Sequence, residues 1–261
     1  GIPAYIIMLV LSVVFYKERT ILLDAAYNLF YFVVDKSFLI TSYRFGEALS
    51  QVLPVIATKA HFSLESVAIS YSAGFTLFYF ACYVICGSVM KRYDLALVVL
   101  LQNILLVSDG FYYITSPLGE GLPMLIVGSA ILANEKMMAN SFVAFVLLPA
   151  LAISVAFFHP ILVIVMIYVG IFFMFKDGVI AKRHLVVFAS IYFITLVIKI
   201  LFFRVQYEAH SLSGLKNFVK LFPDYFTIHS NKQFFQNSFS KYYWIPVFFI
   251  TLIIFYGYRK E

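Results

Sequence analysis

Long runs of apolar residues dominate the chain, and short polar or basic stretches separate them. A hydrocarbon core of about 30 Å takes roughly 20 helical residues, and fewer where flanking aromatic and basic side chains reach the headgroups. On that measure eight segments are predicted to be membrane-spanning helices: 2–16, 64–90, 95–113, 122–134, 141–158, 160–175, 184–203 and 243–258. Residues 21–34, inside a stretch that is mildly apolar yet charged, could form a ninth, shorter span.

Basic residues predict which ends of these segments share one side of the membrane, because short cytoplasmic loops are enriched in Lys and Arg. The connections at 91–92, Lys136 and 176–183, with the tail at 259–260, fall on one side if each segment crosses once. That side, which includes the C-terminus, is predicted to be cytoplasmic. The opposite, outer side then receives two long loops at 17–63 and 204–242. Lys17 and Arg19 would suit a cytoplasmic turn if 21–34 spans.

The first outer loop has a helical periodicity of its own. In 45–61 apolar residues recur at spacings of three and four, which is typical of a helix lying in the membrane interface. Pro54 is expected to kink or interrupt that helix, and 234–239 repeats the pattern in shorter form. The predicted fold class is therefore all-α: a polytopic transmembrane bundle with interfacial amphipathic helices, forming a single transmembrane domain over 1–261.

Composition excludes a water-soluble fold. Of 261 residues, 63% are hydrophobic and 12% are charged, against roughly 45–50% and about 25% in a soluble domain. The net charge of +6 comes from scattered residues rather than a basic stripe. The expected partner is therefore membrane lipid, and no nucleic-acid partner is expected. Cys82 and Cys86 lie four residues apart inside an apolar run and are predicted to be packing residues.

Candidate chemistry lies with the charges at the outer ends of the segments. A charged side chain within the hydrocarbon costs about 2.5–3.5 kcal/mol on insertion scales, so such residues face cavities or partners. Carboxylates and cations on one side would suit a lipid-linked phosphate donor, because Arg and Lys neutralise a phosphate and a carboxylate takes a proton from a hydroxyl. The outer candidates are Asp24, Asp35, Arg44, Glu47, Glu120, His159, Arg204, Glu208 and His210.

Several of these residues also have an ordinary structural interpretation, which stays open here. Asp24 and Glu120 each suit the first turn of a helix, where an acid stabilises the macrodipole. Asp35 suits a solvated interfacial position, and His159 before Pro160 suits a turn. No nucleotide-binding loop or paired-cysteine metal motif occurs in the sequence. The cofactor is thus unknown, and a divalent metal is possible but not indicated.

The order of these features resembles the GT-C superfamily of integral membrane glycosyltransferases, in particular members from bacterial envelope gene sets. The stretches that carry the resemblance are Arg19–Tyr27, Tyr43–Phe45 with Leu49–Pro54, Thr115–Glu120 and Phe158–Pro160. They match a long outer loop that holds two interfacial helices and an acidic residue, followed by helix-opening turns. Asp24 stands alone here, whereas more recognisable members show an acidic pair, and the chain is short for the superfamily.

The resemblance implies transfer of a sugar from a polyprenyl-phosphate carrier to an envelope acceptor on the outer face of the bacterial inner membrane. It implies Asp24 as the base, with Asp35 second, and we expect Arg44 and Arg204 to contact the phosphate. Glu120 and His159 would orient acceptor hydroxyls, and three further residues would bind substrate: Glu47, Glu208 and His210. The alternatives are a non-catalytic membrane subunit that scaffolds an envelope complex with protein partners, and a flippase or polymerase of lipid-linked glycans.

Overall fold

The structure is a computed structural model that describes residues 1–105, 113–175, 182–203, 220–222 and 224–258. These residues are helical throughout, with turns between the helices and no strand among them. The all-α prediction is confirmed for this part of the chain. The chain divides into two compact units, residues 1–204 and residues 205–261, which are described separately.

The helices follow the apolar runs of the sequence, with two π-helical turns that extend their neighbours. In the first unit they are α1 (Ile2–Val14), α2 (Tyr16–Thr20), α3 (Leu23–Asp35), η1 (Thr41–Tyr43), η2 (Phe45–Glu47), α4 (Ala48–Lys59), α5 (Leu64–Val84), η3 (Ile85–Val89), α6 (Tyr93–Leu105), α7 (Pro117–Leu132), α8 (Glu135–Met138), η4 (Val143–Leu147), α9 (Leu148–Ala156), α10 (Leu162–Phe175) and α11 (Lys182–Phe202). The second unit has η5 (Asp224–Thr227), α13 (His229–Ser240) and α14 (Trp244–Tyr258).

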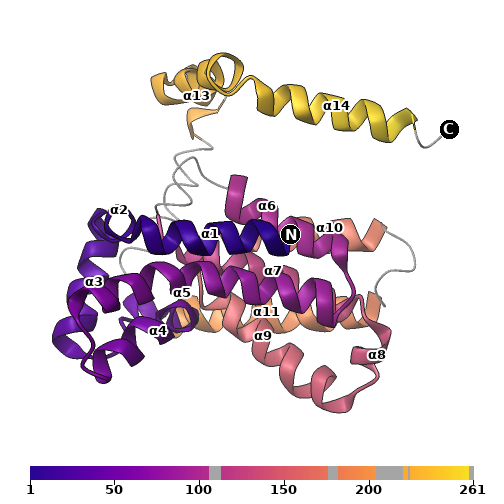
Figure 1. Cartoon of the computed structure of the whole chain (residues 1–261). Coiled ribbons are helices and arrows are strands. Elements are labelled where there is room, and N and C mark those ends of the chain that lie inside the picture. The colour runs from indigo at the N-terminus through magenta and orange to yellow at the C-terminus, as the bar shows by residue number, and fades with distance from the viewer. Residues whose placement is uncertain (106–112, 176–181, 204–219, 223, 259–261) are drawn as a thin grey trace. The chain divides into compact units, whose positions relative to one another are not determined.

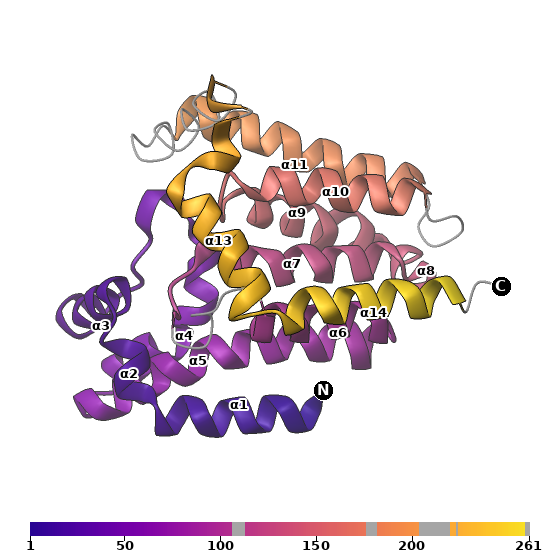
Figure 2. The same cartoon turned by 90° about the horizontal axis from the view of Figure 1, so that it is seen from above.

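The longer helices of the first unit run alongside one another, and two views show the two ends of this bundle. Helices α2, α3 and α4 lie at one end, and α8 lies at the opposite end (Figures 1 and 2). At the α8 end, Asn134 donates from Nδ2 to the Met90 carbonyl oxygen at 3.3 Å, which joins the turns after η3 and α7. The basic connections at 91–92 and Lys136, expected on one side, therefore lie next to each other.

Helix length separates the predicted spans into two groups. Among the described residues, Leu64–Val89 and Arg183–Phe202 are long and apolar enough to cross a membrane, and a third span results if α13 and α14 count as one bent helix. The other predicted spans correspond to apolar helices of 10–17 residues, which rise at most about 26 Å. Helix length thus supports two or three of the eight predicted spans.

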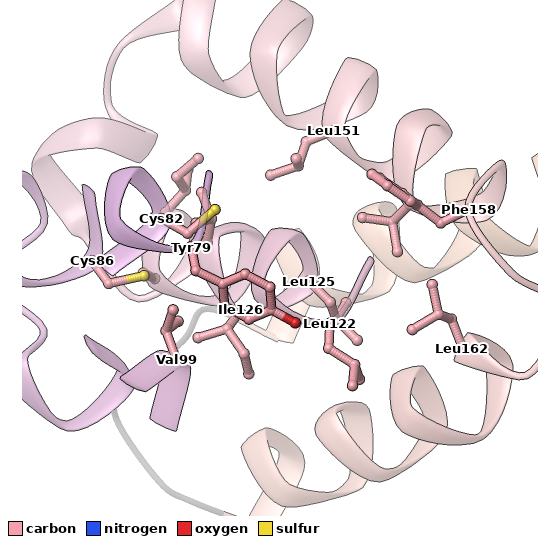
Figure 3. Packing of buried hydrophobic residues seen from close by; sticks show 14 of the residues in the cluster. Tyr79, Cys82, Cys86, Val99, Leu122, Leu125, Ile126, Leu151, Phe158 and Leu162 are labelled. Carbon is pink, nitrogen blue, oxygen red and sulfur yellow. The ribbon is translucent and has the colours of Figure 1, made fainter. Parts of the chain in front are cut away.

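Helix α5 occupies the middle of the buried core. Figure 3 shows Tyr79 between Cys82 and Cys86 of the same long helix on one side and Leu122 and Leu125 of α7 on the other. Both thiols are buried and form no disulfide, which confirms their interpretation as packing residues. Tyr79 donates from its hydroxyl to the backbone carbonyl of Gly119 at 2.5 Å, so a polar bond also ties α5 to the first turn of α7.

The predicted interfacial helix forms, but Pro54 does not interrupt it. Helix α4 runs through Pro54, whose ring removes the donor that would otherwise reach the Ser50 carbonyl. The Ser50 carbonyl oxygen instead lies where α5 approaches closely: a Cβ on Gly74 would come within 2.9 Å of it. Close packing against a glycine of α5 therefore holds this part of α4 in its helical form.

Candidate functional site

The two acids ranked first by the resemblance lie on the surface of α3. Asp24 is exposed in the first turn of this helix, where its Oδ2 accepts a hydrogen bond from the Tyr113 hydroxyl at 2.9 Å. Asp35 is exposed in the last turn of the same helix. Eleven residues separate them, which places them about 16 Å apart along the axis. They therefore do not form an acidic pair.

A buried charged cluster lies instead at the start of α4. Arg44 and Glu47 are each 8% exposed, and the Arg44 Nη1 atom lies 3.8 Å from the Glu47 Oε1 atom. The Thr41 hydroxyl donates to the other carboxylate oxygen, Oε2, at 3.4 Å. Lys199 of α11 is 1% exposed and close enough to act electrostatically on the Glu47 carboxylate. Two cations and a carboxylate, from opposite ends of the sequence, thus share one buried place.

Backbone geometry shapes the turn that carries this cluster. Ser42 and Tyr43 both adopt left-handed conformations, with φ of 53° and 57°, which residues with a Cβ rarely do in succession. This turn leads the chain from η1 into η2 just before Arg44. Gly46 then allows the buried ring of Phe158 to approach, since a Cβ there would lie 2.2 Å from a ring carbon. The turn after α9 is thereby held against η2.

Glu120 joins the cluster from the first turn of α7. Its side chain is buried, and the Ser50 hydroxyl donates to its Oε1 atom at 2.9 Å. Its other oxygen, Oε2, is buried without a hydrogen-bond partner among the described residues. Ser50 also lies 3.2 Å from the Glu47 carbonyl oxygen, so one hydroxyl connects the two acidic residues. The structure therefore brings Arg44, Glu47 and Glu120 together.

Burial controls the proton affinity of both acids. Loss of hydration raises the pKa of Glu47 to about 7, although the positive charges of Arg44 and Lys199 and the Thr41 hydrogen bond act in the opposite direction. Complete burial raises the pKa of Glu120 well above its ordinary value, only partly offset by the Ser50 hydrogen bond, and the neighbouring Glu47 adds to the rise. At neutral pH Glu47 is then close to half-ionised, and burial favours the neutral form of Glu120.

Aromatic rings cover the same region. Tyr43, Phe45, Phe157 and Phe203 form a ring cluster, with centroid distances of 5.1 Å between Tyr43 and Phe203, 5.5 Å between Phe45 and Phe157 and 5.4 Å between Phe157 and Phe203. The Lys199 Nζ atom lies 5.8 Å from the centroid of Phe157. Because Tyr43 and Phe45 are about half exposed, an aromatic surface borders the buried charges.

His159 occupies the turn that was expected for it. It is half-buried, and its Nδ1 atom accepts a hydrogen bond from the backbone N–H of Ile161 at 3.2 Å. That bond stabilises the turn into α10 and occupies one ring nitrogen. The remaining three expected substrate contacts, Arg204, Glu208 and His210, lie outside the described residues.

Sequence reasoning did not anticipate a second buried polar cluster around Arg19. This residue is 1% exposed, and its guanidinium donates to the Ser72 and Thr76 hydroxyls of α5 at 3.1 and 3.2 Å. Ser12 of α1 shares a hydrogen bond of 2.7 Å with Thr76. Ser72 and Thr76 lie four positions apart and so share one face of α5, which is the signal that could have indicated polar contacts with α1 and α2.

Metal ligands do not gather in the part of the chain that the structure describes: no group of three or more His, Cys, Asp or Glu side chains there could hold an ion. In comparisons with known proteins, no family model, curated protein or solved structure matches this chain.

Proposed function

We propose that this protein is a membrane-embedded transferase that acts on a lipid-linked phosphate donor. In its specific form the proposal is a GT-C-like glycosyltransferase that moves a sugar from a polyprenyl-phosphate carrier to an envelope acceptor on the outer face of the bacterial inner membrane. The observation that carries it is the buried cluster, in which Glu47 lies 3.8 Å from Arg44 and within electrostatic reach of Lys199.

Each member of the cluster suits one part of such a reaction. A carboxylate with a pKa of about 7 is matched to work as a general base at neutral pH. Glu47 would take the proton of the acceptor hydroxyl as its oxygen bonds to the sugar's anomeric carbon. The bond between that carbon and the phosphate oxygen breaks, and Arg44 and Lys199 would stabilise the negative charge on the departing polyprenyl phosphate.

This assignment makes Glu47 the base in place of Asp24. Asp24 is an exposed carboxylate bonded to Tyr113, whereas Glu47 lies beside the two cations that a phosphate needs. About a tenth of the Glu47 side chain is accessible, and an acceptor hydroxyl would approach at that exposed part. Glu120, bonded to Ser50, would hold the helix that follows Glu47 in place.

The test is transfer of radiolabelled sugar from polyprenyl-phosphate sugars in membranes that contain the full chain. Glu47→Gln should lower transfer by about 100-fold or more, since general acid–base catalysis contributes about 10²–10⁴-fold. Glu65→Gln is the matched control, because Glu65 is an exposed acid bonded to the Tyr16 hydroxyl on α2. Asp24→Asn should retain activity. Loss of transfer in Asp24→Asn but not in Glu47→Gln would return the base to Asp24.

We also propose that the chain crosses the membrane eight times and that its C-terminus is cytoplasmic. Helices of 13–16 residues would cross a bilayer that is locally thinned, with aromatic and basic side chains reaching the headgroups at their ends. A reporter enzyme active only outside the cytoplasm, fused after Glu261, should then be inactive. An active reporter would reverse the assigned orientation.

A second candidate is a non-catalytic membrane subunit that scaffolds an envelope complex. The exposure of Asp24 and Asp35 on α3 favours it, because charges on an outer surface suit contact with a protein partner. In that case wild-type membranes would transfer no label. Asp24→Asn with Asp35→Asn would instead release a co-purifying membrane protein.

A further inference from the structure

The second unit contains two helices of opposite character. Helix α13 is mostly polar, with nine polar residues among its 12, whereas α14 from Trp244 to Phe255 is apolar except for Thr251. The two helices meet at an angle of 67°. Together they are long and apolar enough to form a single bent span, but Lys232 and its polar neighbours would then have to enter the hydrocarbon.

The three Phe side chains of α13 lie on one side of the helix. At 100° per residue, Phe234, Phe235 and Phe239 fall within an arc of about 140°, which also holds the small polar residues Asn231 and Ser238. The remaining arc holds only polar side chains: His229, Ser230, Lys232, Gln233, Gln236, Asn237 and Ser240. All three Phe rings are exposed, between 45% and 71%. This is a narrow apolar face on a polar helix.

Charge on α13 itself has one sign. Lys232 lies on the polar arc and Lys241 follows the last turn, and the nearest acid before them in the sequence is Asp224, which begins η5. Lysine side chains at the border of an apolar face can extend toward lipid phosphates while their stems cover the acyl chains. A cationic helix with an aromatic face is therefore complementary to an anionic lipid surface.

The bend between the helices carries the residues that favour the membrane interface. Tyr242, Tyr243 and Trp244 occupy it in succession, and all three are exposed. Tyrosine and tryptophan concentrate at the level of the headgroups, where one end of the ring is apolar and the other is wet. Helix α14 starts at this level, and the chain bends by 67° between α13 and α14.

We propose that α13 lies along the anionic surface of a lipid bilayer with its phenylalanine face in the interface, while α14 enters the hydrocarbon from the bend. In this arrangement α13 is an interfacial helix and α14 is a membrane-inserted helix, so the two do not form one span. This proposal does not depend on transferase activity. It assigns to α13 a partner defined by its chemistry, the headgroup region of a bilayer containing phosphatidylglycerol.

Trp244 is the single tryptophan of the chain, which makes fluorescence the direct test. In a Trp244→Phe background, Phe235→Trp places a reporter on the apolar face and Gln233→Trp places a matched control on the polar face, two residues and about 200° away. The full chain is reconstituted in vesicles containing phosphatidylglycerol. Brominated lipids, labelled either near the headgroup or deep in the acyl chains, and aqueous iodide then serve as quenchers.

The expected result is that shallow bromines quench the tryptophan at 235 and iodide does not, whereas the tryptophan at 233 shows the reverse. Stronger quenching at 235 by the deep bromines would overturn the proposal, because α13 would then be part of a span. Quenching at 235 by neither agent would also overturn it, because α13 would then pack against protein. Iodide quenching at both positions would place the helix in water and refute it as well.

A comparison of neutral and anionic vesicles tests whether the lysines of α13 bind anionic lipid. In vesicles of neutral phosphatidylcholine, iodide should quench the tryptophan at 235 more strongly than in anionic vesicles. The double variant Lys232→Gln, Lys241→Gln should remove that difference, while Ser230→Gln, on the polar arc, should preserve it. Equal iodide quenching of the unmodified helix in both kinds of vesicle would show that anionic lipid is not the partner.

Discussion

The raised pKa of Glu47 predicts how the stability of the protein depends on pH. A rise from 4.5 to about 7 means that the folded protein binds a proton more tightly than the unfolded chain. Below pH 4.5 the carboxyl is protonated in both states. As the pH rises through 7, the folded state must hold an ionised carboxylate at a buried position, so folding stability is lost between these two values and the loss levels off above them.

The shift sets the size of that loss. Each pKa unit corresponds to about 1.4 kcal/mol, so the change amounts to about 3 kcal/mol at pH 8. Glu47→Gln removes the titrating group while keeping the shape of the side chain. Because the two proteins differ only at position 47, the difference between wild type and variant reports on the Glu47 carboxyl.

The measurement is the thermal unfolding midpoint in detergent between pH 5 and pH 8. The wild-type midpoint should fall relative to that of Glu47→Gln across this interval, by about 2–4 °C for each kcal/mol. Glu65→Gln, which changes an exposed acid, should follow the wild-type curve. Parallel curves for wild type and Glu47→Gln would refute the reasoning, since they would mean that Glu47 titrates alike in the folded and unfolded states.

Two further substitutions test the packing around the cluster. Gly46→Ala should destabilise the protein by about 1–3 kcal/mol, because its Cβ would collide with the buried Phe158 ring. The control is Gly170→Ala in α10, where the glycine has open space around it; this change should leave the unfolding midpoint unchanged or raise it. Ser50→Ala should cost about 1–3 kcal/mol by leaving the buried Glu120 carboxyl without its donor. Glu120→Gln keeps an acceptor for Ser50 and should cost less in the same unfolding assay, and equal losses would contradict the assigned bond.

The sequence was sufficient to predict helices and the end of the bundle where charges gather. Apolar runs mark each of the main helices, and the placement of charges at run ends put Arg44, Glu47 and Glu120 in one group. Which acid is buried could not be predicted, because burial depends on the packing of distant segments. Lys199 of α11 acts electrostatically on Glu47, and the Phe158 ring packs at the neighbouring Gly46; local periodicity reveals neither interaction.

Helix lengths were also beyond the reach of the hydrophobic pattern. The predicted span 141–158 is apolar to its end, yet the helix there ends at Ala156, before the turn at Phe158. In α4 the opposite occurred, since Pro54 signals an interruption and the helix continues because α5 packs against it at Gly74. Local signals of this kind yield to tertiary contacts, whose energies are larger than those of single residues.

The burial of Arg19 has a consequence for how the chain is made. Its hydroxyl partners, Ser72 and Thr76, follow it by 53 and 57 residues. At a synthesis rate of about 5–20 residues per second, they emerge from the ribosome roughly 3–11 s later. Until then the guanidinium lacks these two acceptors, and burying it without them is costly. The packing that buries Arg19 is therefore complete only once α5 has been made.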